Sequence, residues 1–235
     1  MTLVAFHRPS WSRYRALRGD LGRQSLLRCL EYERLARLDL AGSVLDFGGG
    51  EVTNYSDRRS AWGASYTYES ANIDPTTRPT YLVGEDGQIP VPDARYDAVL
   101  SLNTLEHVYA VTDALIELRR VLKPGGRLVI VAPFIFRVHG HPDDYHRSTP
   151  SWWTKTLTGI GFDTPRVEAL SWGPYTTAGV VTGLPGPFKR VRRETAMLAD
   201  LAYAGLRRRR IEAAQDTPEV SAPLAYFLCA RRRNP

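Results

Sequence analysis

The stretch Ser43-Val44-Leu45-Asp46-Phe47-Gly48-Gly49-Gly50 decides the fold class of this 235-residue chain. Its first part has the apolar character of a short buried strand, and the three glycines that follow predict a sharp turn. Glycines at the end of a strand let the backbone approach a ligand closely and adopt dihedral angles that a side chain would forbid. A plain tight turn would have the same sequence, so the residues around this stretch must decide between the two interpretations.

The rest of the chain shows strand patterns alternating with helix patterns. Helices are predicted at 21–40, 111–121 and 152–160, and further short strands at 71–75, 96–101, 127–132, 166–170 and 224–230. This alternation predicts an α/β fold with a parallel, doubly wound sheet. We expect residues 1–40 to form an N-terminal helical cap, and residues 41–235 to form the main domain with an insertion at about 172–221 near the rim of the site.

Asp74 stands at the end of the predicted second strand, where a nucleoside-binding site would have an acid. In open α/β sheets, ligands bind outside the carboxyl ends of the strands at the topological switch point. A carboxylate at this spacing from the glycine turn can accept hydrogen bonds from ribose hydroxyls. The spacing therefore indicates a nucleoside ligand, without separating NAD from S-adenosylmethionine.

Five motifs between residues 43 and 133 resemble those of class I S-adenosylmethionine-dependent methyltransferases, in the same order. They lie at 44–50, 72–75, 84–97, 100–108 and 122–128. The resemblance implies a Rossmann-like, mostly parallel seven-stranded sheet with helices on both faces, and S-adenosylmethionine as the cofactor. One departure is Val52, which replaces the usual further glycine of the turn. That replacement also disfavours a diphosphate-binding loop, in which glycine permits the close approach of the next helix.

The resemblance implies a role for each residue of the cofactor site. The glycines would lie against the methionine part, Asp46 would place the glycine turn, and Asn103 would line the sulfonium side. Asp74 would hold the ribose, while the acids of the 84–90 loop would read the adenine amino group. The residues expected to bind the cofactor are thus Asp46, Gly48, Gly49, Gly50, Asp74, Pro75, Glu85, Asp86 and Asn103.

A segment dense in titratable side chains follows the predicted fifth strand, next to the place where an acceptor would bind in this fold. Of the chain's five histidines, His139, His141 and His146 fall in it. We expect a general base among these three, with His146 and His141 ranked first and Asp144 as an orienting partner or hydroxyl ligand. Such a base typically accelerates a reaction ~100- to 10,000-fold. A polar loop without a catalytic role is the alternative.

The same loop, 133–149, resembles that of bacterial methyltransferases found with glycan assembly systems, which modify sugar hydroxyls. A narrower resemblance, supported by the arginine-rich composition, is to the mycobacterial oligomannoside 1-O-methyltransferases of methylmannose polysaccharide synthesis. We therefore expect O-methylation of a saccharide or a related small molecule in polysaccharide biosynthesis. A Mg²⁺ ion is an optional second cofactor, and its ligands would be Asp143, Asp144 or Glu106, because histidine is not a favoured magnesium ligand. For His107 we expect a structural or cofactor-side role.

Composition limits the class of protein further. The apolar fraction of 43% and charged fraction of 24% are typical of a globular domain. The two cysteines, Cys29 and Cys229, fit reduced thiols, and the chain shows neither a signal-peptide pattern nor a membrane-spanning stretch, so we expect a cytoplasmic protein. The oligomeric state is left open, with a homodimer as one alternative.

Three further functions stay open at this point. The net charge of +6 comes almost wholly from arginine, and clusters at 190–193, 207–210 and 231–233 would suit an RNA methyltransferase. We expect no nucleic-acid partner, because the sequence contains no recognised RNA-binding module and an arginine run is more often a solvated helix face. The chain could also be a non-catalytic cofactor-binding subunit or a nicotinamide-dependent oxidoreductase.

Overall fold

The computed structural model describes residues 3–63, 65–84, 86–140, 142–207 and 217–234. Its strands are β1 (Val4–Phe6), β2 (Ala41–Phe47), β3 (Ser65–Asn72), β4 (Tyr81–Leu82), β5 (Tyr96–Leu102), β6 (Leu122–Pro133), β7 (Arg166–Leu170) and β8 (Ala225–Arg231). The α-helices are α1 (Trp11–Arg18), α2 (Leu26–Leu35), α3 (Val111–Val121), α4 (Pro150–Gly159), α5 (Pro174–Thr182), α6 (Lys189–Leu206) and α7 (Pro218–Ser221). Three 3₁₀ helices are η1 (Ser56–Trp62), η2 (Pro75–Thr77) and η3 (Leu105–His107).

All the strands belong to one sheet, in the order β1-β7-β8-β6-β5-β2-β3-β4. Each neighbouring pair is parallel except those made by β8, which runs antiparallel to both β6 and β7. After β1, the chain forms β2 in the interior of the sheet and adds β3 and β4 toward one edge. It then continues with β5 on the other side of β2. The predicted doubly wound, mostly parallel α/β class is confirmed, with its switch point between β2 and β5.

The sheet has eight strands among the described residues rather than the expected seven. The additional strand is β1, which pairs in parallel with β7, placing Val4 opposite Val167 and Phe6 opposite Ala169. The segment 1–40 therefore contributes a sheet strand as well as the helices α1 and α2. Three apolar-flanked residues are too few for a strand pattern to be recognised, so the sequence pattern indicates only helix in this segment.

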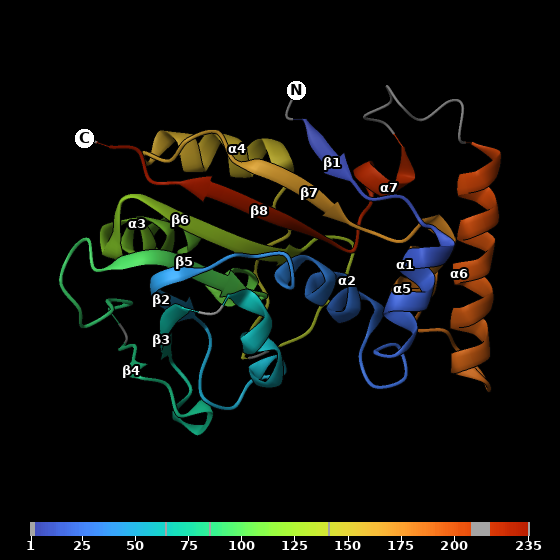
Figure 1. The fold of residues 1–235 in the computed structure, drawn as a ribbon, viewed down its shortest axis with the longest axis horizontal. Coiled ribbons are helices and arrows are strands. Elements are labelled where there is room, and N and C mark those ends of the chain that lie inside the picture. The colour runs from blue at the N-terminus through green and yellow to red at the C-terminus, as the bar shows by residue number, and fades with distance from the viewer. Residues whose placement is uncertain (1–2, 64, 85, 141, 208–216, 235) are drawn as a thin grey trace.

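Helices cover both faces of the sheet, as Figure 1 shows. On one face, Leu115 and Leu118 of α3 and Leu157 of α4 belong to a fully buried apolar cluster with strand residues such as Val99. On the other face, Leu30 of α2 belongs to a second cluster with Trp62 of η1, Val44 and Leu100. Burying the sheet between two helical layers fixes the carboxyl ends of its strands, and the site lies at those ends.

The segment between β7 and β8 forms the helices α5, α6 and α7, which Figure 1 places with α1 at one end of the molecule. The buried Asp200 of α6 holds the start of α5, because its carboxylate accepts hydrogen bonds from the backbone N–H groups of Tyr175 (3.0 Å) and Thr176 (2.9 Å). The Trp172 indole donates to the carbonyl of Met197 at 3.1 Å. These contacts attach α6 to the rest of the domain at two points.

Two properties expected from composition can be compared with the structure. Cys29 and Cys229 are both free thiols. In the described ranges, none of the helices is both long enough and apolar enough to traverse a bilayer.

Candidate active site

A cavity of about 620 Å³ opens at the switch point of the sheet. Its walls come from the carboxyl ends of three neighbouring strands: Gly48 follows β2, Asp74 follows β3, and Asn103 follows β5. Arg28 of α2, together with His107 and His139, completes the wall on the side away from the strands. This volume falls in the range of small-molecule and cofactor sites, ~300–1,000 Å³. The cavity therefore lies where an open α/β sheet binds its ligand.

The glycine turn after β2 is shaped so that only glycine fits at two positions. Gly48 has a φ of 90°, and a Cβ there would lie 2.0 Å from the Thr104 hydroxyl. A Cβ at Gly50 would lie 2.3 Å from the carbonyl oxygen of Thr77. The Asn72 amide stabilises the turn from β3, donating to the carbonyl oxygens of Gly48 (2.8 Å) and Gly49 (3.0 Å). The turn is thus a tightly packed glycine cradle of which Gly48 lines the cavity, whereas Gly49 and Gly50 do not.

Asp46 lies behind this turn and does not line the cavity. Its carboxylate is fully buried and accepts hydrogen bonds from the hydroxyls of Tyr68 (2.8 Å) and Tyr55 (2.9 Å). Burial raises the pKa of this carboxyl to about 6, although the two tyrosine hydroxyls lower it. A Cβ at Gly49 would lie 2.3 Å from the Asp46 carboxylate, so the acid packs directly under the turn. This position suits the expected role of placing the turn.

Asp74 lies on the cavity wall, half-buried at the start of η2. One of its carboxylate oxygens accepts hydrogen bonds from the backbone N–H of Thr76 (2.8 Å) and from the Thr76 hydroxyl (2.7 Å). These contacts fix the orientation of the carboxylate next to Ile73, which also lines the cavity. Pro75 begins η2 and is exposed, outside the cavity lining. The structure therefore places Asp74, but not Pro75, where a ribose could be bound.

The acids expected to read the adenine are not on the cavity wall. Asp86 is exposed and accepts a hydrogen bond from the backbone N–H of Gln88 at 3.1 Å. Glu85 lies outside the described residues. The side chain from this region that does line the cavity is Val83, which is buried and apolar. An apolar surface at this end suits the face of an adenine ring.

Asn103 follows β5 in the left-handed region, with a φ of 53°. Its amide donates to the buried carboxylate of Glu31 in α2 at 2.9 Å, and the same carboxylate accepts from Arg28 at 3.0 Å. Burial raises the pKa of Glu31, while Arg28 and Asn103 lower it. Ser25 caps α2 by accepting from the backbone N–H of Arg28, which sets this helix against the cavity. The N-terminal helix thus positions two cavity-lining side chains.

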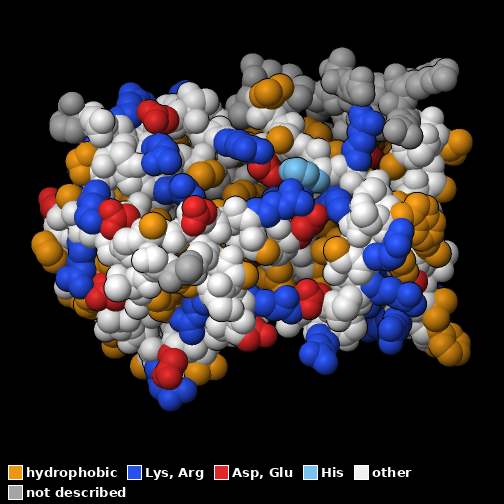
Figure 2. Space-filling model, viewed as in Figure 1, with side chains coloured by type: hydrophobic (Ala, Val, Ile, Leu, Met, Phe, Trp, Pro, Cys, Tyr) orange, Lys and Arg blue, Asp and Glu red, His pale blue; other side chains and the backbone are white. Residues whose placement is uncertain are grey.

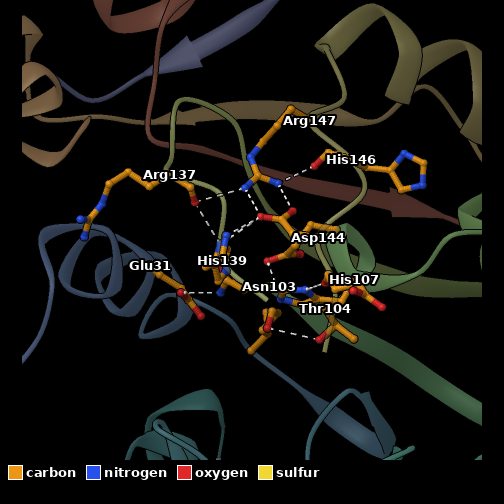
Figure 3. A network of polar contacts seen from close by, with 12 residues as sticks. Glu31, Asn103, Thr104, His107, Arg137, His139, Asp144, His146 and Arg147 are labelled. Atoms are coloured by element: carbon orange, nitrogen blue, oxygen red, sulfur yellow. Dashed lines mark hydrogen bonds and ion pairs between the residues drawn. The ribbon is translucent and has the colours of Figure 1, made fainter. Parts of the chain in front are cut away.

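His139 is the member of the histidine-rich loop that the described structure places on the cavity wall. The Asp144 carboxylate accepts a hydrogen bond from its backbone N–H at 2.9 Å and lies 3.2 Å from its Nδ1. Arg147 binds both oxygens of the same carboxylate, as Figure 3 shows. Burial alone would raise the pKa of Asp144, but Arg147 and the His139 N–H lower it to about 2. Asp144 is therefore an ionised group that orients the His139 imidazole.

The two histidines ranked first from the sequence are placed differently. In Figure 3 the His146 imidazole points away from the polar network, and its Nε2 lies 3.0 Å from the carbonyl oxygen of Tyr109. It does not line the main cavity. His141 lies outside the described residues. The sequence could not rank these histidines, because which way a loop side chain points depends on backbone turns that have no periodic pattern.

Glu106 and His107 lie in η3, directly after the β5 carboxyl end. The Glu106 side chain is 1% exposed, and burial raises its pKa to about 8. In the part of the chain that the structure describes, neither of its carboxylate oxygens has a hydrogen-bond partner. The Nε2 of His107 lies 3.7 Å from its Oε1, and His107 lines the cavity. A buried acid without hydrogen bonds is costly and requires an explanation.

The three acids expected to hold a metal ion are not brought together. Asp144 is bound by Arg147, and Asp143 is exposed and accepts a hydrogen bond from the Tyr145 hydroxyl at 3.0 Å. Among the described residues, the side chains that do gather are Glu106, His107 and His139. One ligand atom from each of the three lies within 4.8 Å of the others.

Comparison with known proteins finds a similarity in the central part of the chain. Residues 45–130 match the family model described as a methyltransferase domain. The match covers 86 of the 235 residues of the chain. The matched range runs from β2 into β6 and so includes the glycine turn, Asp74 and η3. S-adenosylmethionine is the cofactor of such a domain, as the sequence motifs implied.

The chain is also similar to curated proteins and to solved structures. An uncharacterized protein of Mycobacterium tuberculosis, Rv1509, is 28% identical over 145 residues, which cover 54% of this chain and 46% of the relative. The chain therefore spans about half the length of this curated relative.

Among solved structures, a chain of the complex between the Haloferax volcanii Trm112 methyltransferase activator and a protein described as a methyltransferase matches with a TM-score of 0.58 and 16% identity, over 97% of this chain and 100% of that one. Haemonchus contortus phosphoethanolamine N-methyltransferase 2, solved with S-adenosyl-L-methionine, matches with a TM-score of 0.52 and 14% identity, over 97% of this chain and 54% of that one. At these identities the structural matches show that the fold is shared.

Several residues that shape the candidate site were missed by sequence reasoning. Arg28 and Glu31 lie before the recognised motifs. Asn72 lies within the motif at 72–75, in which only Asp74 and Pro75 were predicted as site residues. The clearest available signal was an arginine and a glutamate on the apolar side of the predicted 21–40 helix. Charged residues on a buried helix face are rare unless they are paired or face a ligand.

Proposed function

We propose that this chain is an S-adenosylmethionine-dependent methyltransferase that methylates a hydroxyl group of a saccharide or a related small molecule. The observation that carries the proposal is the single cavity wall shared by a glycine cradle, Asp74 and the oriented His139 imidazole. S-adenosylmethionine, when bound, supplies a methyl group already activated by positive sulfur. The protein's main task is then to align the acceptor with that methyl group.

The residues around the cavity fit S-adenosylmethionine. The cradle at Gly48 leaves no room for a side chain, as a close-lying methionine part requires. Arg28 presents a guanidinium to the cavity, and this group can bind the methionine carboxylate. Asp74 can accept hydrogen bonds from the ribose hydroxyls, and the apolar Val83 can contact the adenine. These assignments extend the roles implied by the sequence motifs.

A hydroxyl acceptor needs help to lose its proton, and the His139–Asp144 pair can provide it. Asp144 stays ionised over the whole physiological range because its pKa is about 2. It therefore holds Nδ1 of His139 as a donor and leaves Nε2 as the basic nitrogen. We therefore propose His139, rather than His146 or His141, as the general base that activates the hydroxyl. The saccharide acceptor itself rests on the likeness of the 133–149 loop to glycan-modifying enzymes.

The test is methyl transfer from labelled S-adenosylmethionine to a panel of oligosaccharides, lipid-linked sugars and RNA. We expect label in a saccharide acceptor. The variant His139→Gln should lower kcat by ~100-fold or more while cofactor binding stays intact, because loss of a general base has this size of effect. The matched variant His146→Gln should retain transfer. Loss of transfer in His146→Gln alone would contradict the role given to His139, and label only in RNA would contradict the acceptor class.

A further inference from the structure

We propose that Glu106, His107 and His139 form a binding site for a divalent transition-metal ion on the wall of the cofactor cavity. One ligand atom of each lies within 4.8 Å of the others. The His107 Nε2 and the Glu106 Oε1 are 3.7 Å apart, close to the roughly 3.4 Å that separates two ligands of a tetrahedral zinc ion. Two imidazoles and one carboxylate are the ligand set of many catalytic zinc and non-haem iron sites.

Both imidazoles are held in the tautomer that can bind a metal through Nε2. The Nδ1 of His107 contacts the carbonyl oxygen of Asp143, which can only accept a hydrogen bond. The Nδ1 of His139 lies 3.1 Å from the carbonyl oxygen of Arg137 and 3.2 Å from the Asp144 carboxylate, again two acceptors. Each Nδ1 must therefore carry the hydrogen, and each Nε2 carries the lone pair. A carbonyl or carboxylate behind a histidine is the usual support of a metal ligand.

Glu106 supplies the second, independent observation. Its side chain is 1% exposed, and within the described ranges both carboxylate oxygens lack hydrogen-bond partners. An isolated buried carboxylate is strongly unfavourable unless it is neutralised or coordinates a cation. The nearby guanidinium groups are engaged elsewhere, Arg147 with Asp144 and Arg28 with Glu31. A bound divalent ion would satisfy the carboxylate and explain why an acid occupies this position.

Two imidazole ligands distinguish this ion from the magnesium expected at Asp143, Asp144 or Glu106. Imidazole nitrogens are preferred by Zn²⁺, Co²⁺, Ni²⁺ and Fe²⁺, whereas Mg²⁺ prefers oxygen ligands. His107 and His139 both face the cavity, and three protein ligands leave at least one coordination position for a further oxygen. Under the proposed function, that oxygen is the acceptor hydroxyl. The Nε2 of His139 cannot bind the ion and accept a proton at the same time. Direct proton transfer from the acceptor hydroxyl to His139 therefore applies to the metal-free chain.

The first test measures metal binding by the whole chain, without cofactor or acceptor. After dialysis against a chelator, the protein is titrated with Zn²⁺, Co²⁺ or Mg²⁺ by calorimetry, and the Co²⁺ complex is followed by visible absorption. We expect one equivalent of Zn²⁺ or Co²⁺ to bind, Co²⁺ to show the absorption of a low-coordinate nitrogen–oxygen site, and Mg²⁺ to bind at least 100-fold more weakly. Absence of stoichiometric Zn²⁺ and Co²⁺ binding would overturn the proposal.

Variants locate the site. Glu106→Gln and His139→Gln keep side-chain size and should each weaken Zn²⁺ binding about 100-fold or more, whereas His146→Gln, outside the cluster, should leave it unchanged. Asp144→Asn, which weakens the support of His139 and the ion pair with Arg147 without removing a ligand, should weaken binding ~10- to 100-fold. Binding of S-adenosylmethionine shows that each variant is folded. Equal Zn²⁺ affinity in Glu106→Gln, His139→Gln and His146→Gln would place the ion elsewhere and refute the site. Because no methyl transfer is measured, this outcome is independent of whether the proposed function holds.

Discussion

Asp74 offers the most direct test of cofactor binding at the scale of a single residue. Replacing it with alanine removes the carboxylate from the cavity wall and with it the proposed ribose contacts. We expect Asp74→Ala to weaken S-adenosylmethionine binding by more than tenfold, measured by calorimetry. Asp86→Ala is the matched control, because Asp86 is exposed and does not line the cavity. The affinity of this variant for S-adenosylmethionine should equal that of the unaltered chain. Unchanged affinity in Asp74→Ala would remove the ribose assignment.

Asp46 should make the stability of the fold depend on pH. Its pKa is raised from 3.8 to about 6 by burial, so the folded state holds the proton more tightly than the unfolded state. The stabilisation from that proton is complete below pH 3.8 and is lost as the pH rises through about 6. By linkage, this amounts to about 2–3 kcal/mol in the free energy of unfolding.

The variant Asp46→Asn keeps an acceptor for the two tyrosine hydroxyls and cannot ionise. We expect the difference in unfolding free energy between this variant and the unaltered chain to grow in favour of the variant from pH 4 to pH 8. Urea unfolding at several pH values measures that difference. A difference that stays constant with pH would show that Asp46 does not titrate in this range.

At this scale, sequence reasoning predicted site residues that lie in motifs and did not consider those that lie outside them. Gly48, Gly50 and Asp74 were predicted because a strand end followed by glycines, and an acid at the next strand end, have few structural alternatives. Arg28 lines the cavity, and Glu31 binds Asn103, from a helix that precedes the motifs. Their position depends on how α2 packs across the sheet, which local pattern does not specify.

At the scale of elements, the contact between α5 and α6 should be important for stability. The Asp200 carboxylate is 1% exposed and accepts hydrogen bonds from two backbone N–H groups at the start of α5. We expect Asp200→Ala to lower the free energy of unfolding by about 2 kcal/mol, the upper end for loss of a helix-capping side chain. Urea unfolding measures this loss.

Cofactor binding separates this effect from damage to the site. The cavity lining contains no described residue of α5, α6 or α7, so Asp200→Ala should bind S-adenosylmethionine as the unaltered chain does. Asp200→Asn retains one acceptor and should lose less stability than the alanine variant. If Asp200→Ala weakened cofactor binding instead of stability, the helices would have a role in the site that their position does not suggest.

Some elements were predicted closely, but β3, predicted at 71–75, spans Ser65–Asn72, and β6, predicted at 127–132, spans Leu122–Pro133. The predicted helix at 111–121 is α3, and the strands predicted at 96–101, 166–170 and 224–230 differ from β5, β7 and β8 by at most one residue at either end. These segments have a clear apolar period or a continuous apolar run. The two-residue β4 and three-residue β1 have neither, and only their pairing in the sheet makes them strands. The division at residue 40 and the 172–221 insertion stay predictions about domain organisation.

At the scale of the whole molecule, the charge distribution bears on whether RNA is a substrate. The net charge is +6, but Figure 2 shows Lys and Arg interspersed with Asp and Glu over most of the face it presents. Several arginines are held in ion pairs, such as Arg13 with Glu33 at 2.6 Å and Arg95 with Glu69 at 2.7 Å. A surface of this kind gives weak, salt-sensitive attraction rather than a dedicated binding track.

We therefore expect single-stranded RNA to bind with a Kd of about 10⁻⁶ M or weaker at physiological salt, which is typical of non-specific contacts. Fluorescence anisotropy of a labelled RNA at low and physiological salt measures this affinity. Binding in the nanomolar range at physiological salt would favour the RNA methyltransferase that the sequence left open.

The position of β1 has a consequence for how the chain reaches its native state. Val4 can pair with its neighbour only after Val167 has been made, and β7 in turn pairs with β8, whose residues come later still. At the usual rate of synthesis on a ribosome, this leaves the first strand waiting on the order of 10 seconds or more. Contacts so distant in sequence also form late in refolding, since a long loop must close before they stabilise anything. The N-terminal strand is therefore expected to be the last edge of the sheet to close and the first to open.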